Sequence, residues 1–307
     1  MNSEMQLPVR IAAFPKCYLD AIVRDHTLFE WIELSRQLDV EGLELYEHFF
    51  TSLDDAYIDR VGEAIEQTGR VMPMLCCSPD FTNPDVNERE RAVEREARMI
   101  RITRRLGGPR AACRVLSGQR YPDVSIEQGA EWVVSAIEQL LPVAREYDVI
   151  LAMENHYKDG YWKYPEFAQK QDIFLRIVNA ISDRDHFGVQ YDPSNAIVAG
   201  EDPIALLYQV ADRVVTMHAS DRYVVAGATL DELRTSDGTI GYSPKLQHGV
   251  VGKGLNDYDA IFKILADAKF SDWVSIEDGM NGMDEMFESV NFLKRMREKY
   301  FSSVSVT

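Results

Sequence analysis

The stretch SIEQGAEWVVSAIEQLLPVAREYDVILAMEN, residues 125–155, decides the fold class of this chain. Its first part carries apolar residues three and four positions apart, which indicates an amphipathic helix, and its end, VILAMEN, is typical of a short buried strand. The same alternation of strand and helix runs along the chain, without a low-complexity stretch or a Pro/Ser-rich linker. The other predicted strands are 9–15, 41–47, 70–76, 111–117, 187–193, 214–220 and 273–278.

Eight strands that alternate with helices predict a parallel sheet, because each crossover helix has to cover a face of that sheet. Helical windows at 87–108 and 283–301 continue the pattern. Eight units within 307 residues match a closed (β/α)8 barrel. The alternative is an open doubly wound sheet, but no glycine-rich nucleotide fingerprint follows the first strand. We therefore expect an α/β TIM barrel that forms a single catalytic domain over residues 1–307.

The charge balance argues against two classes of partner. The chain has 33 Lys and Arg against 50 Asp and Glu, a net charge of −17. Such a surface repels phosphate backbones and anionic lipid, so we expect neither nucleic acid nor a membrane as a partner. The start of the chain lacks a signal-peptide pattern. The four cysteines show no zinc spacing and suit reduced thiols, which predicts a cytoplasmic location.

Two long connections follow predicted strands at the end of the barrel where enzymes of this architecture build their sites. Residues 156–166 carry Tyr157, Tyr161, Trp162 and Tyr164, which could form a wall for a sugar ring or an aglycone, or could fill the loop's own core. Residues 221–256 contain many glycines. We expect this second segment to act as a lid over the substrate.

Side chains alternate between the interior and the helix layer along barrel strands. Placing the apolar positions against the helices turns Glu154, Asp192, His218 and Glu277, from four successive strands, toward the barrel mouth. One such residue alone is ordinarily a cap, a salt-bridge partner or an interior histidine, but three neighbouring carboxylates repel one another unless a cation lies between them. Three oxygen donors and one imidazole suit Mn²⁺, Co²⁺ or Mg²⁺. We therefore predict one divalent metal ion at these four residues.

Other inward positions lie close to the predicted metal site. His156 shares the parity of Glu154 and lies about 6–7 Å further along the strand, where it could be a catalytic base or a structural hydrogen-bond donor. Glu44 and Arg114 also point inward, and could pair with each other or bind substrate. The candidate substrate contacts are Tyr157, Trp162, Gln190, Arg222, His248 and Arg114.

Five motifs carry a resemblance to a known superfamily: MENH at 153–156, YDPSN at 191–195, MHASD at 217–221, GKGLNDYDAIF at 252–262 and SIEDG at 275–279. With them the chain resembles the sugar phosphate isomerase/epimerase superfamily, the xylose-isomerase-like TIM barrels, over essentially its whole length. In the ketose epimerases of this superfamily, Glu, Asp, His and Glu hold one Mn²⁺-type ion. The resemblance implies these roles for Glu154, Asp192, His218 and Glu277.

Two details distinguish branches of the superfamily. Ketose epimerases carry an arginine six residues past the metal histidine, where this chain has Val224, and Arg222 lies four residues past it. His156 and the wide aromatic loop resemble the catalytic subunits of bacterial C-glycoside deglycosidases, which act on 3-oxo-glycosides made by a partner oxidoreductase. The resemblance implies a small carbohydrate substrate, and allows a small second subunit or a homo-oligomer.

The sugar-processing branches share the removal of a proton from a carbon next to a carbonyl. The leading hypothesis is β-elimination from a keto-sugar or 3-oxo-glycoside, that is C- or O-deglycosylation, with His156 as base. The alternative is epimerisation or isomerisation with Glu154 and Glu277 as acid and base. An endonuclease IV-like repair enzyme is disfavoured, because that branch uses three metals and more histidines than the six present here. A non-catalytic scaffold is also disfavoured, since it has no need of a buried anionic cluster.

Overall fold

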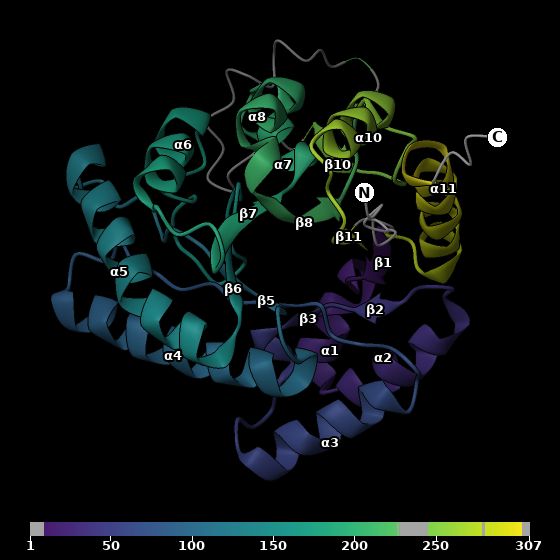
Figure 1. Ribbon diagram of the computed structural model, residues 1–307, viewed down its shortest axis with the longest axis horizontal. Coiled ribbons are helices and arrows are strands. Elements are labelled where there is room, and N and C mark those ends of the chain that lie inside the picture. The colour runs from purple at the N-terminus through teal and green to yellow at the C-terminus, as the bar shows by residue number, and fades with distance from the viewer. Residues whose placement is uncertain (1–8, 226, 228–244, 278–279, 303–307) are drawn as a thin grey trace, which may run out of the picture.

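The computed structural model describes residues 9–225, 227, 245–277 and 280–302, and it is a parallel barrel enclosed by helices (Figure 1). The strands follow the order β2-β1-β11-β8-β7-β6-β5-β4-β3. β2 (Gly42–Leu43) pairs with β1, and β3 (Leu45–Tyr46) pairs with β4, so the two halves of one segment join the ends of the sheet. The predicted α/β TIM barrel is confirmed.

Each predicted strand occurs within its predicted range. The 41–47 segment differs in one respect, because it divides at Glu44 into the two short strands β2 and β3. The remaining barrel strands are β1 (Arg10–Ala13), β4 (Met74–Cys76), β5 (Ala112–Val115), β6 (Ile150–Glu154), β7 (Phe187–Tyr191), β8 (Val214–Ala219) and β11 (Trp273–Ile276).

The helices surround the sheet (Figure 1). Their apolar side chains pack into the hydrophobic core. Polar caps begin the two long helices that the sequence predicted: the side chain of Asp85 accepts from the backbone N–H of Asn87, and that of Ser125 from Gln128. The helices are α1 (Leu19–Asp25), α2 (Leu28–Leu34), α3 (Asp55–Glu66), α4 (Val86–Gly107), α5 (Ile126–Tyr147), α6 (Gln171–Ala180), α7 (Pro193–Val198), α8 (Pro203–Val210), α10 (Tyr258–Asp267) and α11 (Met283–Phe301).

The segment after β8 begins and ends in an antiparallel pair, β9 (Arg222–Val224) with β10 (Leu246–His248). The carboxylate of Asp221 accepts hydrogen bonds from the backbone N–H groups of Gly252, Gly254 and Asn256, which fixes the base of this segment. Half of the predicted lid, residues 226 and 228–244, lies outside the described residues. Among the helices that the structure describes, none is both long and apolar enough for a bilayer crossing.

Candidate metal and catalytic site

Four polar side chains meet at the carboxyl ends of neighbouring strands. Glu154 is the last residue of β6, Asp192 follows β7, His218 lies on β8 and Glu277 follows β11. Asp192 also caps α7, because its Oδ1 accepts from the N–H groups of Ser194 and Asn195, and this fixes the direction of the carboxylate. Each of the four residues is at most 9% exposed, so the cluster lies inside the barrel mouth.

The distances in this cluster are those of potential ligands around one centre. His218 Nδ1 lies 3.5 Å from Glu154 Oε1 and 3.5 Å from Glu277 Oε2. One ligand atom each from Glu154, Asp192 and His218 lie within 4.8 Å of one another. Asp192 Oδ2 and His218 Nδ1 are buried without a hydrogen-bond partner among the described residues. Because buried polar atoms ordinarily have partners, these orphaned atoms fit a divalent cation between them.

The charges around the cluster hold its carboxylates in different states. Burial raises the pKa of Glu154, but the Arg114 guanidinium, 2.7 Å away, outweighs burial together with His156 and His218 and brings that pKa to about 2. Burial likewise opposes ionisation of Glu277, yet Lys16 at 2.8 Å and His218 keep its pKa well below the usual range. The pKa of Asp192 is raised well above its ordinary value by burial and by the neighbouring charges of Glu277 and Glu154. Asp192 is therefore the carboxylate that most needs a cation.

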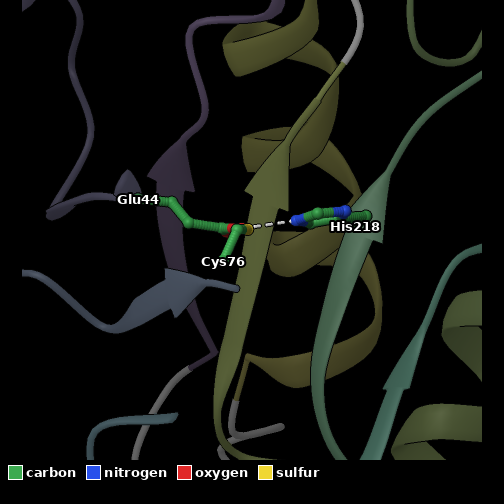
Figure 2. A group of neighbouring side chains, drawn as sticks. All are labelled: Glu44, Cys76 and His218. Atoms are coloured by element: carbon green, nitrogen blue, oxygen red, sulfur yellow. Dashed lines mark hydrogen bonds and ion pairs between the residues drawn. The ribbon is translucent and has the colours of Figure 1, made fainter. Parts of the chain in front are cut away.

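A buried carboxylate and a thiol orient the imidazole from behind (Figure 2). His218 Nε2 lies 2.5 Å from Oε1 of Glu44, and Cys76 donates its thiol proton to the same oxygen at 2.8 Å. Since a carboxylate only accepts, Nε2 keeps its proton and Nδ1 faces Glu154 and Glu277. Burial lowers the pKa of His218, but the charges of Glu44 and Glu277 raise it well above the usual value. A cation at Nδ1 would replace a proton there and leave the bond to Glu44 intact.

Glu44 and Arg114 point inward, as predicted, and of the two alternatives for them the structure does not show a pair between these two residues. Glu44 takes His218 as its partner from across the barrel. Arg114 donates to Glu154 at 2.7 Å, to the carbonyl of Cys77 at 3.0 Å and to the hydroxyl of Ser78 at 3.1 Å. The physical reason is charge: the cluster needs a cation beside Glu154 and an anion beside His218.

His156 lies in the wall of a cavity of about 540 Å³ that also includes Glu277. Its Nδ1 is 3.5 Å from Oε2 of Glu166, and its ring stacks on Tyr157 with 5.0 Å between ring centres. Glu166 is wholly buried, and its other oxygen accepts from the backbone and hydroxyl of Ser117. A fixed carboxylate behind an imidazole can set the ring's tautomer and stabilise its protonated form.

The cavity includes some of the predicted substrate contacts and omits others. Tyr157 and Arg114 line it, together with Phe14, Lys16, Leu19, Asp20, Val23, Arg24, Tyr46, His156, Lys158, Asp159, Gly160, Tyr161 and Glu277. Trp162 is buried at 9% exposure and Arg222 at 2%, and neither is among these lining residues. Gln190 lies on β7 beside Glu154 and is fully buried, and His248 lies on β10, so the structure places both outside the cavity wall.

Sequence reasoning missed two residues that matter for this geometry. Lys16 lies shortly after β1, so its place at the carboxyl end of a barrel strand was the available signal. Glu166 ends the aromatic loop, and nothing in the nearby sequence marks it as the partner of a histidine ten positions earlier.

A family model described as "Xylose isomerase-like TIM barrel" matches residues 32–296. The chain belongs to this family. The relative "Inosose dehydratase 2" of Bacillus cereus (strain ZK / E33L) is 21% identical over 157 residues, which are 50% of this chain and 48% of that protein. The chain thus matches about half the length of that relative.

Solved structures share this family's fold with the chain. A D-tagatose 3-epimerase-like protein has a TM-score of 0.72 at 15% identity, covering 95% of this chain and 98% of that one. The IOLI protein with a bound zinc atom has a TM-score of 0.70 at 18% identity, covering 96% and 100%. The 3-keto-D-glucoside 4-epimerase YcjR from E. coli has a TM-score of 0.65 at 15% identity, covering 94% and 99%. Two of these proteins, the inosose dehydratase and the 3-keto-D-glucoside 4-epimerase, are named for an enzymatic activity, and the IOLI protein holds a zinc atom.

Proposed function

We propose that this protein is a divalent-metal-dependent enzyme that removes a proton next to the carbonyl of a keto-sugar or 3-oxo-glycoside and completes a β-elimination. One observation carries this proposal. Glu277 of the buried cluster lines the same cavity as His156. The cluster contains ligand atoms without a hydrogen-bond partner among the described residues, and the buried carboxylate of Glu166 lies 3.5 Å from His156. The names of two relatives, an inosose dehydratase and a 3-keto-D-glucoside epimerase, support this substrate class.

Glu154, Asp192, His218 and Glu277 would hold the metal ion, the histidine through Nδ1. Three carboxylates and one imidazole favour Mn²⁺, with Co²⁺ and Mg²⁺ as alternatives. When bound, the ion supplies Lewis acidity that polarises a substrate carbonyl and stabilises negative charge developing on its oxygen. Arg114 and Lys16 keep two of the carboxylates ionised, so these groups are ready to act as ligands at neutral pH.

His156 is the proposed base. Its neutral imidazole takes the proton from the carbon beside the carbonyl, and Glu166 stabilises the imidazolium that results. The electron pair of the broken C–H bond becomes the carbon–carbon double bond of an enolate. When the carbonyl re-forms, that pair moves to the next carbon–carbon bond, and the group on the β-carbon leaves with its own bonding pair. The leaving group then gains a proton, so the products are an unsaturated ketone and the free leaving group.

A second candidate is epimerisation or isomerisation. One observation favours it: Glu154 and Glu277 approach His218 Nδ1 at the same distance of 3.5 Å, as a two-carboxylate acid/base pair would. However, each of these carboxylates also contacts a cationic side chain, Arg114 or Lys16, which weakens it as a base.

Incubation in D₂O separates the two candidates. The Mn²⁺-supplied protein is given a methyl 3-oxo-glycoside and, separately, a free ketose, and the products are followed by NMR. Release of methanol with formation of an unsaturated ketone supports β-elimination. Deuterium in a recovered ketose, without release, supports epimerisation or isomerisation. Neither exchange nor release with any keto-sugar contradicts the proposed function.

A further inference from the structure

A second group of potential metal ligands lies away from the barrel mouth, between the sheet and α4. Its members are Cys77, directly after β4, Cys113 on β5 and Glu96 on α4. Each is at most 2% exposed, and one ligand atom from each lies within 4.8 Å of the others. The candidate cluster in the barrel mouth uses none of these three residues.

The alternation of side chains along the strands brings both thiols to the same layer. Cys113 precedes the inward-pointing Arg114, and Cys77 follows the inward-pointing Cys76. Both thiols therefore point out of the barrel, toward the helices. Glu96 lies on the face of α4 that packs into this layer, so three elements each bring one ligand to the same place.

Glu96 is an unusual residue for such a position. Ionisable side chains are almost never fully buried without a partner of opposite charge, but the nearby guanidinium groups of Arg95 and Arg114 pair with other carboxylates. The contact of Glu96 is with Cys113, whose thiol donates to Oε1 at 3.3 Å. Burial raises the pKa of Glu96 well above its usual value, so the group keeps its proton until a cation replaces it.

The distances in this group fit tetrahedral zinc. Zn–S bonds of about 2.3 Å at the tetrahedral angle place two sulfur ligands about 3.8 Å apart, and a sulfur and a carboxylate oxygen about 3.6 Å apart. The two Sγ atoms of Cys77 and Cys113 are 3.9 Å apart, and Cys113 Sγ lies 3.3 Å from Glu96 Oε1. A direct disulfide fits less well, because Cys113 pairs with Leu75, two residues before Cys77, an offset of about 6–7 Å along the strand.

An additional buried oxygen is available for the fourth position of such an ion. Thr103 lies two helical turns after Glu96 on α4, next to Cys113. Its Oγ1 is buried without a hydrogen-bond partner among the described residues. Because buried hydroxyl groups ordinarily have partners, this oxygen fits a fourth ligand, either directly or through a water molecule.

We propose that Cys77, Glu96, Thr103 and Cys113 form a structural zinc site between the sheet and α4. Two thiolates select Zn²⁺ over the harder ions that suit the barrel mouth. Binding would release the protons of both thiols and of Glu96. The ion would join α4 to the loop after β4, where the carbonyl of Cys77 accepts from Arg114 at 3.0 Å. This site is independent of the proposed reaction.

Cobalt distinguishes this site from the barrel mouth. Co²⁺ can replace Zn²⁺, and its bonds to thiolates give a charge-transfer band in the near ultraviolet that oxygen and nitrogen ligands do not give. The full-length protein is expressed in minimal medium with Co²⁺, so that it folds around the ion, and its absorption spectrum and metal content are measured. We expect the band in the wild type and also in Asp192→Asn, which changes only the mouth cluster.

Substitutions locate the band. Cys77→Ala and Cys113→Ala should each abolish it, and Glu96→Gln should lower the cobalt affinity of this site by more than about 10-fold. Cys17→Ser is the matched control and should keep the band, because Cys17 is a free cysteine outside both clusters. Circular dichroism shows which variants are folded.

Three outcomes overturn the proposal. The first is a folded wild-type protein without a thiolate band, a result that needs no variant and so stands even if a substitution prevents folding. The second is a band that persists in both Cys77→Ala and Cys113→Ala. The third is a disulfide between Cys77 and Cys113, found by mass spectrometry in protein purified without a reductant.

Discussion

The two halves of the barrel contribute different parts of the site. The strands β6, β7, β8 and β11 carry Glu154, Asp192, His218 and Glu277, the residues that could bind a metal. The opposite strands, β1 to β5, carry the groups that set the charge and orientation of those residues. Their members are Lys16, Glu44, Cys76 and Arg114. The half formed by β6, β7, β8 and β11 would bind the ion, and the other half would set the charge and orientation of the residues that bind it. Substitutions in the two halves should therefore have different effects on metal affinity and stability.

Removal of the metal should have the largest effect. Arg114 and Lys16 contact Glu154 and Glu277, whereas Asp192 Oδ2 has no hydrogen-bond partner among the described residues. We therefore expect chelation to abolish proton exchange on a keto-sugar and Mn²⁺, Co²⁺ or Mg²⁺ to restore it. The measurement is the exchange rate before and after dialysis against a chelator. Full turnover by protein shown to be metal-free would refute the metal requirement.

Substitutions of the candidate metal ligands should have the next largest effect. Asp192→Asn and His218→Ala should each lower metal affinity by more than about 100-fold. The reason is that loss of a residue that binds the metal directly costs more affinity than loss of a residue that only hydrogen-bonds to a ligand. Without metal, Asp192→Asn should unfold at or above the wild-type temperature, because it removes a buried charge that Glu277 and Glu154 repel. His218→Ala should unfold at a lower temperature, because it leaves the buried carboxylate of Glu44 without its histidine partner. Calorimetric Mn²⁺ titration and circular dichroism measure the two quantities. A variant with wild-type affinity removes that residue from the ligand set.

His156 should separate chemistry from metal binding. His156→Ala is expected to keep Mn²⁺ affinity but to lose turnover by about 10²–10⁴, as for loss of a general base. His186→Gln is the matched control, because His186 precedes β7 at the opposite end of the barrel from the site. If His156→Ala keeps a near-normal kcat, β-elimination through this base is excluded and the epimerase candidate gains.

Glu44→Gln tests the residues that orient and charge the candidate ligands. The amide oxygen can still accept from Nε2 of His218, but the negative charge that strengthens the imidazole as a ligand is gone, so metal affinity should fall by about 10–100-fold. Glu63→Gln, on the exposed side of α3, controls for the chemical change. An unchanged metal affinity in Glu44→Gln would show that the charge of Glu44 does not strengthen His218 as a metal ligand.

The smallest effect should be a graded dependence of metal affinity on pH. Asp192 and His218 have pKa values raised above 3.8 and 6.5, and both must lose a proton to bind a cation. Metal affinity should therefore fall as pH drops through these raised values, with proton release on binding. Glu154, whose pKa is about 2, and Glu277 are already ionised and add no dependence in this window. Titrations at about pH 6 and about pH 8, in buffers of different ionisation enthalpy, count the protons.

The sequence predicted the fold and the inward direction of the candidate ligands and of Glu44 and Arg114, but not which side chains would contact one another. The alternation of side chains along β6, β7, β8 and β11 is a local property, so it placed Glu154 and its neighbours correctly. Glu44 and His218 are 174 residues apart, and only closure of the barrel brings them together. Arg114 and Glu154 lie on the consecutive, paired strands β5 and β6, so their contact needs no closure of the sheet. The direction of each side chain was readable from the sequence, whereas the partner of Glu44 was a consequence of the closed sheet.

The most direct test of the account is an anomalous difference map from crystals grown with Mn²⁺, measured near the manganese absorption edge. We predict one strong peak in the barrel mouth, coordinated by Glu154, Asp192, Glu277 and Nδ1 of His218, with Nε2 of His218 still bonded to Glu44. A map with no peak among these four residues, or with a peak bound elsewhere while the protein is active, would contradict the account.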